Sequence, residues 1–114
     1  RNKDEKLWIM EKRLAVAKKH LEAQNKKIFY DEIFRTLYEF LSDKLSIPVS
    51  DLSKESIINH LQKKEFAKEK ILELISTLDK CEFARYAPAS ESGEMKSVYE
   101  NAIAIITTIE EEVR

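Results

Sequence analysis

Residues 28–45, which read IFYDEIFRTLYEFLSDKL, decide the fold of this chain. Apolar side chains recur in this stretch every three or four positions, which is the spacing of an α-helix. They make two adjoining faces, one with Phe29, Ile33, Leu37, Phe40 and Leu41 and the other with Tyr30, Phe34, Tyr38 and Leu45. A helix that is apolar over so wide an arc is usually packed on two sides. We therefore expect this helix at the centre of the domain.

Further helices are predicted before and after this central stretch, at residues 4–23, 54–63, 68–86 and 93–113. The first carries a narrow apolar stripe, and its short link to the central helix favours an antiparallel pair. Ser53 is a suitable N-cap for the third helix, although a full capping box would have Glu or Gln in place of Ser56. The residues expected to face the core are Leu7, Met10, Leu14, Ala17, Leu21, Ile57, Ile58, Leu61, Ile71, Leu74, Ile75, Leu78, Cys81, Met95, Val98, Tyr99, Ala102, Ile103, Ile106, Ile109 and, as an open case, Phe83.

The composition supports one all-α domain. A chain of 114 residues has the size of a single domain, and 43% hydrophobic with 36% charged residues is typical of a globular core under a charged surface. One Gly and two Pro are too few for the many turns of a sheet protein. The expected architecture is about five helices in a single compact bundle, beginning with a long antiparallel helix pair.

Charge is unevenly distributed along the chain. Residues 1–27 contain nine Lys/Arg and four Asp/Glu, a balance of +5, whereas residues 28–114 contain eleven and seventeen, a balance of −6. A basic first helix beside an acidic body is typical of a segment near an anionic membrane or a nucleic acid, and equally of a solvated lysine-rich helix. The candidate membrane-proximal residues are Lys12, Arg13, Lys18 and Lys19. The pI near 6.2 argues against nucleic-acid binding.

No residue pattern in the sequence indicates catalysis, a cofactor or a metal. Cys81 is the only cysteine, which excludes an internal disulfide and suits a reducing compartment. Neither His20 nor His60 shares a catalytic motif with Cys81. Gly93 is the only glycine, so the glycine-rich loops that bind phosphates are missing. The three consecutive Glu residues at 110–112 are expected to form a solvated helix end. We therefore predict no enzymatic activity, no cofactor and no small-molecule substrate.

The segment 81–88, with the sequence CEFARYAP, contains the candidate interaction surface. Phe83, Arg85 and Tyr86 cluster near a predicted helix end, and aromatic residues beside arginine are typical anchors of protein interfaces. In the alternative interpretation, Phe83 and Tyr86 seal the core while Arg85 pairs with an acidic neighbour. We favour this second interpretation from the sequence.

Several short strings occur in an order that resembles a known family. They are FYDE at 29–32, LSDKL at 41–45, Pro48, DLS at 51–53, CEFARYAP at 81–88, and then Met95, Tyr99 and Ala102. Together they resemble the C-terminal region of the BatD family, named after the Bacteroides aerotolerance operon. The resemblance extends over residues 14–113, which is nearly the whole chain.

The resemblance implies a larger parent protein. BatD-like proteins have a large extracytoplasmic β-rich region, a membrane helix and a helical tail on the cytosolic side of the bacterial inner membrane. Such a tail would hold its basic first helix next to an anionic lipid surface. The implied partners are other Bat proteins or a MoxR-type AAA+ ATPase, and the family has no catalytic or metal-binding residues to transfer. Because the chain begins with Arg1 and not Met, we also expect a segment of a longer protein.

Two other functions stay open on the sequence alone. The first is a tetratricopeptide-like peptide-binding scaffold, since Leu14, Ala17 and Tyr30 fall loosely at repeat positions, although the glycine and proline markers of such repeats are missing. The second is a thiol-based redox sensor at Cys81. That function would need an exposed thiol with a lowered pKa.

Overall fold

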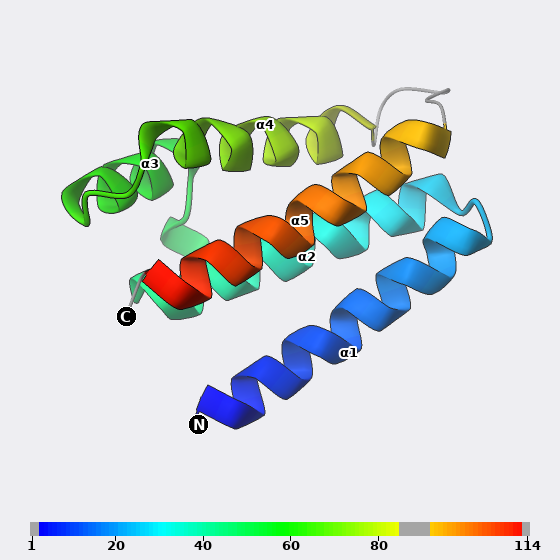
Figure 1. Cartoon of the computed structure of the whole chain (residues 1–114), viewed down its shortest axis with the longest axis horizontal. Helices are drawn as coiled ribbons and strands as arrows, with labels where there is room; N and C mark the ends of the chain where they lie inside the picture. The colour runs from blue at the N-terminus through cyan, green and yellow to red at the C-terminus, as the bar shows by residue number, and fades with distance from the viewer. Residues whose placement is uncertain (1–2, 85–91, 113–114) are drawn as a thin grey trace.

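The computed structural model describes residues 3–84 and 92–112, and within these ranges the chain is helical with no strand. The elements are α1 (Lys3–Glu22), α2 (Lys26–Leu45), the short 3-10 helix η1 (Val49–Asp51), α3 (Lys54–Lys63), α4 (Lys68–Ala84) and α5 (Ser92–Glu112) (Figure 1). The all-α prediction is confirmed, and each described helix end lies within two residues of its predicted place. The predicted end of the fourth helix, at Arg85 and Tyr86, lies outside the described residues.

Helix α2 lies at the centre of the bundle, as its two apolar faces predict. It contacts α1, α3, α4 and α5, whereas α1 packs on α2 and α5, and α3 packs on α2 and α4. Figure 1 shows α1 running antiparallel to α2 along one side of the molecule, with α4 on the opposite side and α2 and α5 between them. The predicted antiparallel pair is therefore confirmed.

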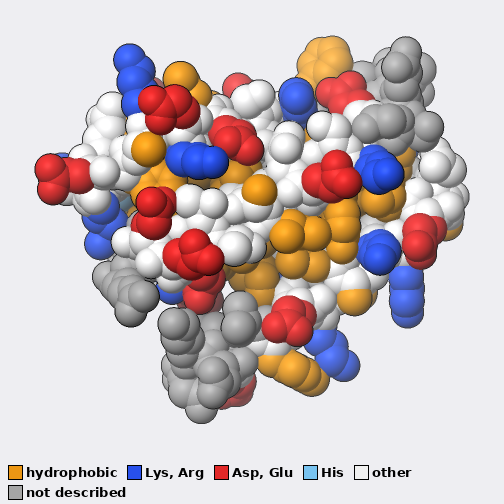
Figure 2. Space-filling view, in the orientation of Figure 1, with side chains coloured by type: hydrophobic (Ala, Val, Ile, Leu, Met, Phe, Trp, Pro, Cys, Tyr) orange, Lys and Arg blue, Asp and Glu red, His pale blue; other side chains and the backbone are white. Residues whose placement is uncertain are grey.

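A single hydrophobic cluster contains side chains from all five α-helices. Met10 and Ala17 are the buried residues of α1 in this cluster, and they show that the first helix packs on the body at these positions. The side chain of Leu7, also predicted in the core, lies outside what the structure describes. Leu14, Leu21, Ile58, Ile75 and Tyr99 are partly buried and pack against it. In Figure 2, hydrophobic side chains also gather in the seam between α5 and α1, with acidic and basic side chains beside them.

Two residues of the predicted core point outward. Phe83 has 73% of its surface exposed, and Ile103 has 37%. Each residue of a helix is rotated by about 100° from the one before, so Phe83 lies on the far side of α4 from the buried Cys81. Ile103 is rotated out of the buried stripe of α5, and Ile105, which the sequence analysis missed, is buried in that stripe.

The capping box of α3 is complete, which corrects the partial one predicted. The Ser53 amide donates to Ser56 Oγ at 2.9 Å, and the Ser56 amide donates to Ser53 Oγ at 3.1 Å. The Ser56 hydroxyl thus accepts the hydrogen bond of the N-cap amide, which a Glu or Gln side chain usually accepts at this position. The acidic end of α5 is also less solvated than predicted, because Glu110 forms an ion pair with Lys44 of α2 while Glu111 and Glu112 are exposed.

Thr36 is a buried polar residue that we expect to cost stability. It is 1% exposed on α2, and its Oγ1 has no hydrogen-bond partner among the described residues. A buried hydroxyl without a partner costs about 1–3 kcal/mol, so Thr36→Val is expected to raise the free energy of unfolding by about 1 kcal/mol. Urea denaturation measures this change.

Thr77 provides the matched control for this substitution. It is equally buried on α4, but its Oγ1 donates to the Glu73 carbonyl oxygen at 2.9 Å. Thr77→Val removes a satisfied hydroxyl and is expected to give no stabilisation. Equal effects of the two substitutions would contradict the assignment of an unsatisfied hydroxyl to Thr36.

Candidate functional site

The structure describes one of the three residues of the predicted interaction surface. Phe83 lies at the C-terminal end of α4, and its ring is largely exposed. The interpretation that Phe83 seals the core is therefore wrong, whereas its role as an interface anchor stays a prediction. Arg85 and Tyr86 lie outside the described residues, so their part in the surface stays a prediction.

Phe83 continues a line of exposed residues along the outer side of α4. Leu72, with 60% of its surface exposed, lies eleven residues before it, which is three helical turns or about 16 Å. Ser76 and Asp79 lie between them at helical spacing and are exposed. We call Leu72, Ser76, Asp79 and Phe83 the α4 ridge. The opposite side of the helix carries the buried residues Ile71, Leu74, Thr77, Leu78, Cys81 and Ala84.

Leu72 was not among the predicted surface residues, although the sequence contains the signal for it. Leu72 follows Ile71 directly, and the predicted buried stripe of α4 already accounts for Ile71, Leu74 and Leu78. A leucine left over on the opposite side of a helix has no core to enter. Sorting the apolar residues of α4 by helical angle would have placed Leu72 beside Phe83.

A cluster of charges fixes the end of α4 that carries Phe83. Lys54, the first residue of α3, hydrogen-bonds through Nζ to Asp79 and to Glu82 of α4. The bonds to Asp79 and then to Glu82 raise the pKa of Lys54 far above its usual value. The raised pKa keeps Lys54 charged throughout the neutral range, and on the alkaline side its contribution to the stability of the folded chain is lost only at strongly alkaline pH.

Tyr38 of α2 borders this charge cluster. Burial raises the pKa of Tyr38, the charge of Glu82 raises it further, and Lys54 opposes the change. The Tyr38 ring also stacks on Phe34, with 4.5 Å between the ring centroids. The C-terminal half of the α4 ridge thus lies beside charged and aromatic groups of α3 and α2, and the bond between Lys54 and Glu82 joins residues 28 positions apart in sequence.

The predicted basic residues of α1 fall into two groups. Arg13 forms an ion pair with Glu39 of α2, with 2.7 Å between Arg13 Nη2 and Glu39 Oε2, so it serves the packing of α1 on the body. Lys12, Lys18 and Lys19 are exposed. Lys12 Nζ lies 4.6 Å from the ring centroid of the exposed Trp8, at cation–π distance.

No described group of side chains forms a reactive or metal-binding centre. Cys81 is fully buried in the core cluster, so its thiol lacks the exposure that a redox sensor needs. His20 and His60 are partly buried, and His60 Nδ1 lies 2.9 Å from the Ser56 carbonyl oxygen within α3. Within residues 3–84 and 92–112 no three His, Cys, Asp or Glu side chains gather as metal ligands would.

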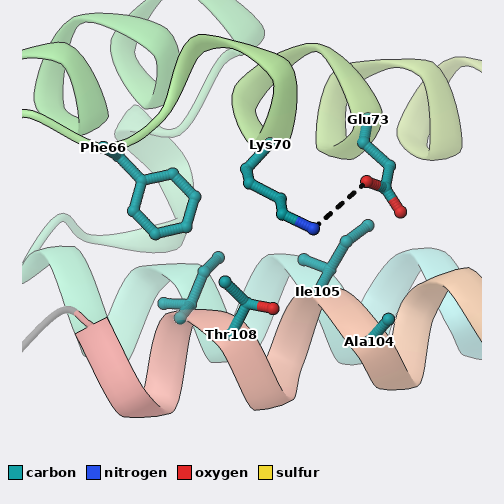
Figure 3. Close-up of a pocket in the computed structure, with 7 residues that line it drawn as sticks. Phe66, Lys70, Glu73, Ala104, Ile105 and Thr108 are labelled. Atoms are coloured by element: carbon teal, nitrogen blue, oxygen red, sulfur yellow. Dashed lines mark ion pairs between the residues drawn. The ribbon is translucent and has the colours of Figure 1, made fainter.

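A shallow crevice lies between α4 and α5 and offers no room for a sizeable ligand. Its volume of about 220 Å³ includes space open to solvent, which is below the usual range for ligand pockets. Lys70 and Glu73 of α4 face Ala104, Ile105 and Thr108 of α5 across it (Figure 3). Lys70 Nζ is 4.0 Å from Glu73 Oε2, a pair within one helix turn. The crevice is a packing seam, and the convex α4 ridge is the more distinctive surface.

Comparisons with known proteins assign neither a family nor a function to this chain. No family model, curated protein or solved structure matches the chain. None of the described helices combines the length and the apolar character that crossing a bilayer requires.

Proposed function

We propose that this chain is a non-catalytic protein-interaction domain that docks its partner through the α4 ridge. The observation that carries this proposal is the exposure of Phe83 and Leu72 in one line on the outer side of α4. Leu72 and Phe83 occupy the first and last positions of an i, i+4, i+7, i+11 series, with the polar Ser76 and Asp79 between them. Exposed apolar side chains on one face of a helix are the anchors by which helices enter apolar grooves. The exposed phenylalanine is the principal anchor, because large desolvated side chains supply most interface energy.

The shape of the surface supports docking over substrate binding. The ridge is convex, and the crevice between α4 and α5 is too small for a sizeable ligand. Lys54 pairs with both Asp79 and Glu82, so this cluster beside Phe83 has a net charge of −1 and each of its carboxylates keeps a cationic neighbour when a partner covers the border. The same cluster holds the end of α4 in place before the partner arrives, which lowers the entropic cost of binding.

The identity of the partner follows from the resemblance to BatD. We propose that the domain is the cytosolic tail of a membrane-anchored, BatD-like oxygen-tolerance protein, on the cytosolic side of the bacterial inner membrane. Its ridge docks another Bat protein or a MoxR-type AAA+ ATPase. The closed packing of α1, α4 and α5 around α2 gives no support to the tetratricopeptide-like alternative, which would need an open peptide groove.

A pull-down from native cytosol tests this proposal. The domain is the bait, ATP or ADP is added, and recovered proteins are identified by mass spectrometry. Leu72→Ser combined with Phe83→Ser is expected to lower the affinity for the MoxR-type ATPase or Bat partner by about 30-fold or more, as loss of an interface hot spot does. Nucleotide dependence of the recovery would identify the ATPase state that the domain recognises.

The matched control removes exposed apolar side chains elsewhere. Val49→Ser combined with Ile103→Ser removes two exposed apolar side chains from η1 and α5, with exposures of 50% and 37% in the native chain. This control is expected to recover the partner as the native chain does. Equal loss in both variants, or recovery of neither protein class by a folded native bait, would contradict docking through the ridge.

A further inference from the structure

The outer face of α1 combines aromatic, basic and aliphatic side chains in one line. Trp8, Lys12, Val16 and Lys19 recur at intervals of three or four residues, and we call them the α1 outer face. Trp8 has 58% of its surface exposed and Val16 has 42%. The face lies opposite Met10 and Ala17, the side of α1 that is buried against the body.

From this arrangement we infer that α1 is a peripheral membrane-contact element, whose outer face lies on an anionic lipid bilayer. Tryptophan partitions to the level of the lipid headgroups, and lysine neutralises their phosphates while its aliphatic stem stays in the apolar boundary. The cation–π contact between Lys12 and Trp8 places both groups side by side, so that they reach the headgroup layer together. Val16 continues the apolar contact one turn further along the helix.

The distribution of charge favours this orientation. Residues 8–27 contain six Lys/Arg and two Asp/Glu. With Arg13 paired to Glu39, the exposed charges on α1 in this range are Lys12, Lys18 and Lys19 against Glu11 and Glu22, which leaves a positive balance. Helix α4 lies on the opposite side of the molecule, with α2 and α5 between it and α1 (Figure 1). The shortest dimension of the molecule is 24 Å, well beyond the screening length of about 8 Å at physiological salt. Charges on the outer side of α4 therefore do little to repel a membrane in contact with α1.

A lipid surface explains the α1 outer face better than a nucleic acid does. Contacts to nucleic-acid phosphates need cations and hydrogen-bond donors, whereas half of this face is apolar, with Val16 at its middle. With α1 on the membrane, the α4 ridge faces away from it and stays accessible. The inference about α1 does not depend on the proposed docking function.

Trp8 is the only tryptophan in the chain, so its fluorescence reports directly on this contact. The full chain is titrated with vesicles of phosphatidylcholine alone and of phosphatidylcholine with phosphatidylglycerol. We expect a blue shift of the emission with the anionic vesicles only, reversed by added salt. Lys12→Gln combined with Lys19→Gln is expected to weaken binding to these vesicles about 30-fold, because each lysine near such a surface contributes about fivefold.

Lys63→Gln combined with Lys64→Gln is the control, since it removes two exposed charges at the end of α3. This variant is expected to bind the anionic vesicles as the native chain does. Unshifted Trp8 emission with anionic vesicles, or equal weakening by the two double variants, would overturn the inference. Tighter binding to a short duplex DNA or RNA than to the vesicles would overturn it in favour of nucleic acid.

Discussion

Replacing Leu37 with Ala is expected to lower the free energy of unfolding by about 2–5 kcal/mol. Leu37 is fully buried on α2, the helix that contacts every other α-helix of the bundle. The substitution removes apolar side-chain atoms and leaves a cavity that neighbouring helices cannot close without moving. A domain of this size is stable by about 5–15 kcal/mol, so the loss is a large part of the total. Urea denaturation followed by circular dichroism measures it.

Leu72→Ala is the matched control for this substitution. The same atoms are removed, but from a side chain that is 60% exposed on the α4 ridge, and the expected change is within about 0.5 kcal/mol. Comparing Leu37→Ala with Leu72→Ala distinguishes a leucine that stabilises the core from a leucine that is available to a binding partner. A loss at position 72 as large as that at position 37 would show that Leu72 is a core residue and would remove it from the docking surface.

Ala17→Glu is expected to destabilise the domain by about 3 kcal/mol or more. Ala17 is fully buried in the core cluster on α1, a helix whose contacts are with α2 and α5. The glutamate is too large for this site and brings a carboxyl group that must either be buried at high cost or push α1 away from the body. Denaturation midpoints and hydrogen exchange of the Phe29 and Ile33 amides measure the two consequences.

Ala15→Glu provides the control on the same helix. Ala15 is exposed, two residues away and on the other side of α1. The same substitution there adds charge without entering the core, and it is expected to change stability by less than about 0.5 kcal/mol. If Ala17→Glu were equally harmless, α1 would not be packed on the body in solution.

Helical periodicity predicted most of the fold because the core residues of each helix share one side. The spacing of Phe29, Ile33, Leu37 and Leu41 identified the central helix, and all four are buried in the structure. Ser53 marked the start of α3, and its side chain accepts from the Ser56 amide as an N-cap does. These signals are local, so a single sequence contains them in full.

The outward position of Phe83 was harder to predict because it depends on how far residue 83 is rotated about the axis of α4 from the buried residues. Phe83 follows the buried Cys81 by two residues, which rotates it to the far side of α4. A large aromatic residue near a helix end also suits the closing of a core, and composition alone cannot separate these two roles. The exposed position is what makes Phe83 available to a partner.

Contacts between distant segments were beyond the reach of sequence patterns. The pair of Arg13 with Glu39 and the bonds of Lys54 to Asp79 and Glu82 depend on how the helices pack, and each helix offers many other charged residues. The contact of Lys12 with Trp8 differs, because residues four apart on one helix are neighbours and their spacing can be seen in the sequence. Helical periodicity predicts which side of a helix is buried. The contacts of its outward side chains with other helices depend on how the helices pack, which only the structure shows.

Photo-crosslinking from the α4 ridge is the most direct test of the proposed docking function. A photoreactive phenylalanine analogue replaces Ser76, which is exposed between Leu72 and Phe83, and in a second chain it replaces the exposed Thr107 of α5. Each chain is irradiated in native cytosol. The account predicts a covalent adduct with a MoxR-type ATPase or another Bat protein from position 76 and none from position 107. An adduct with such a partner from position 107 and none from position 76 would contradict it.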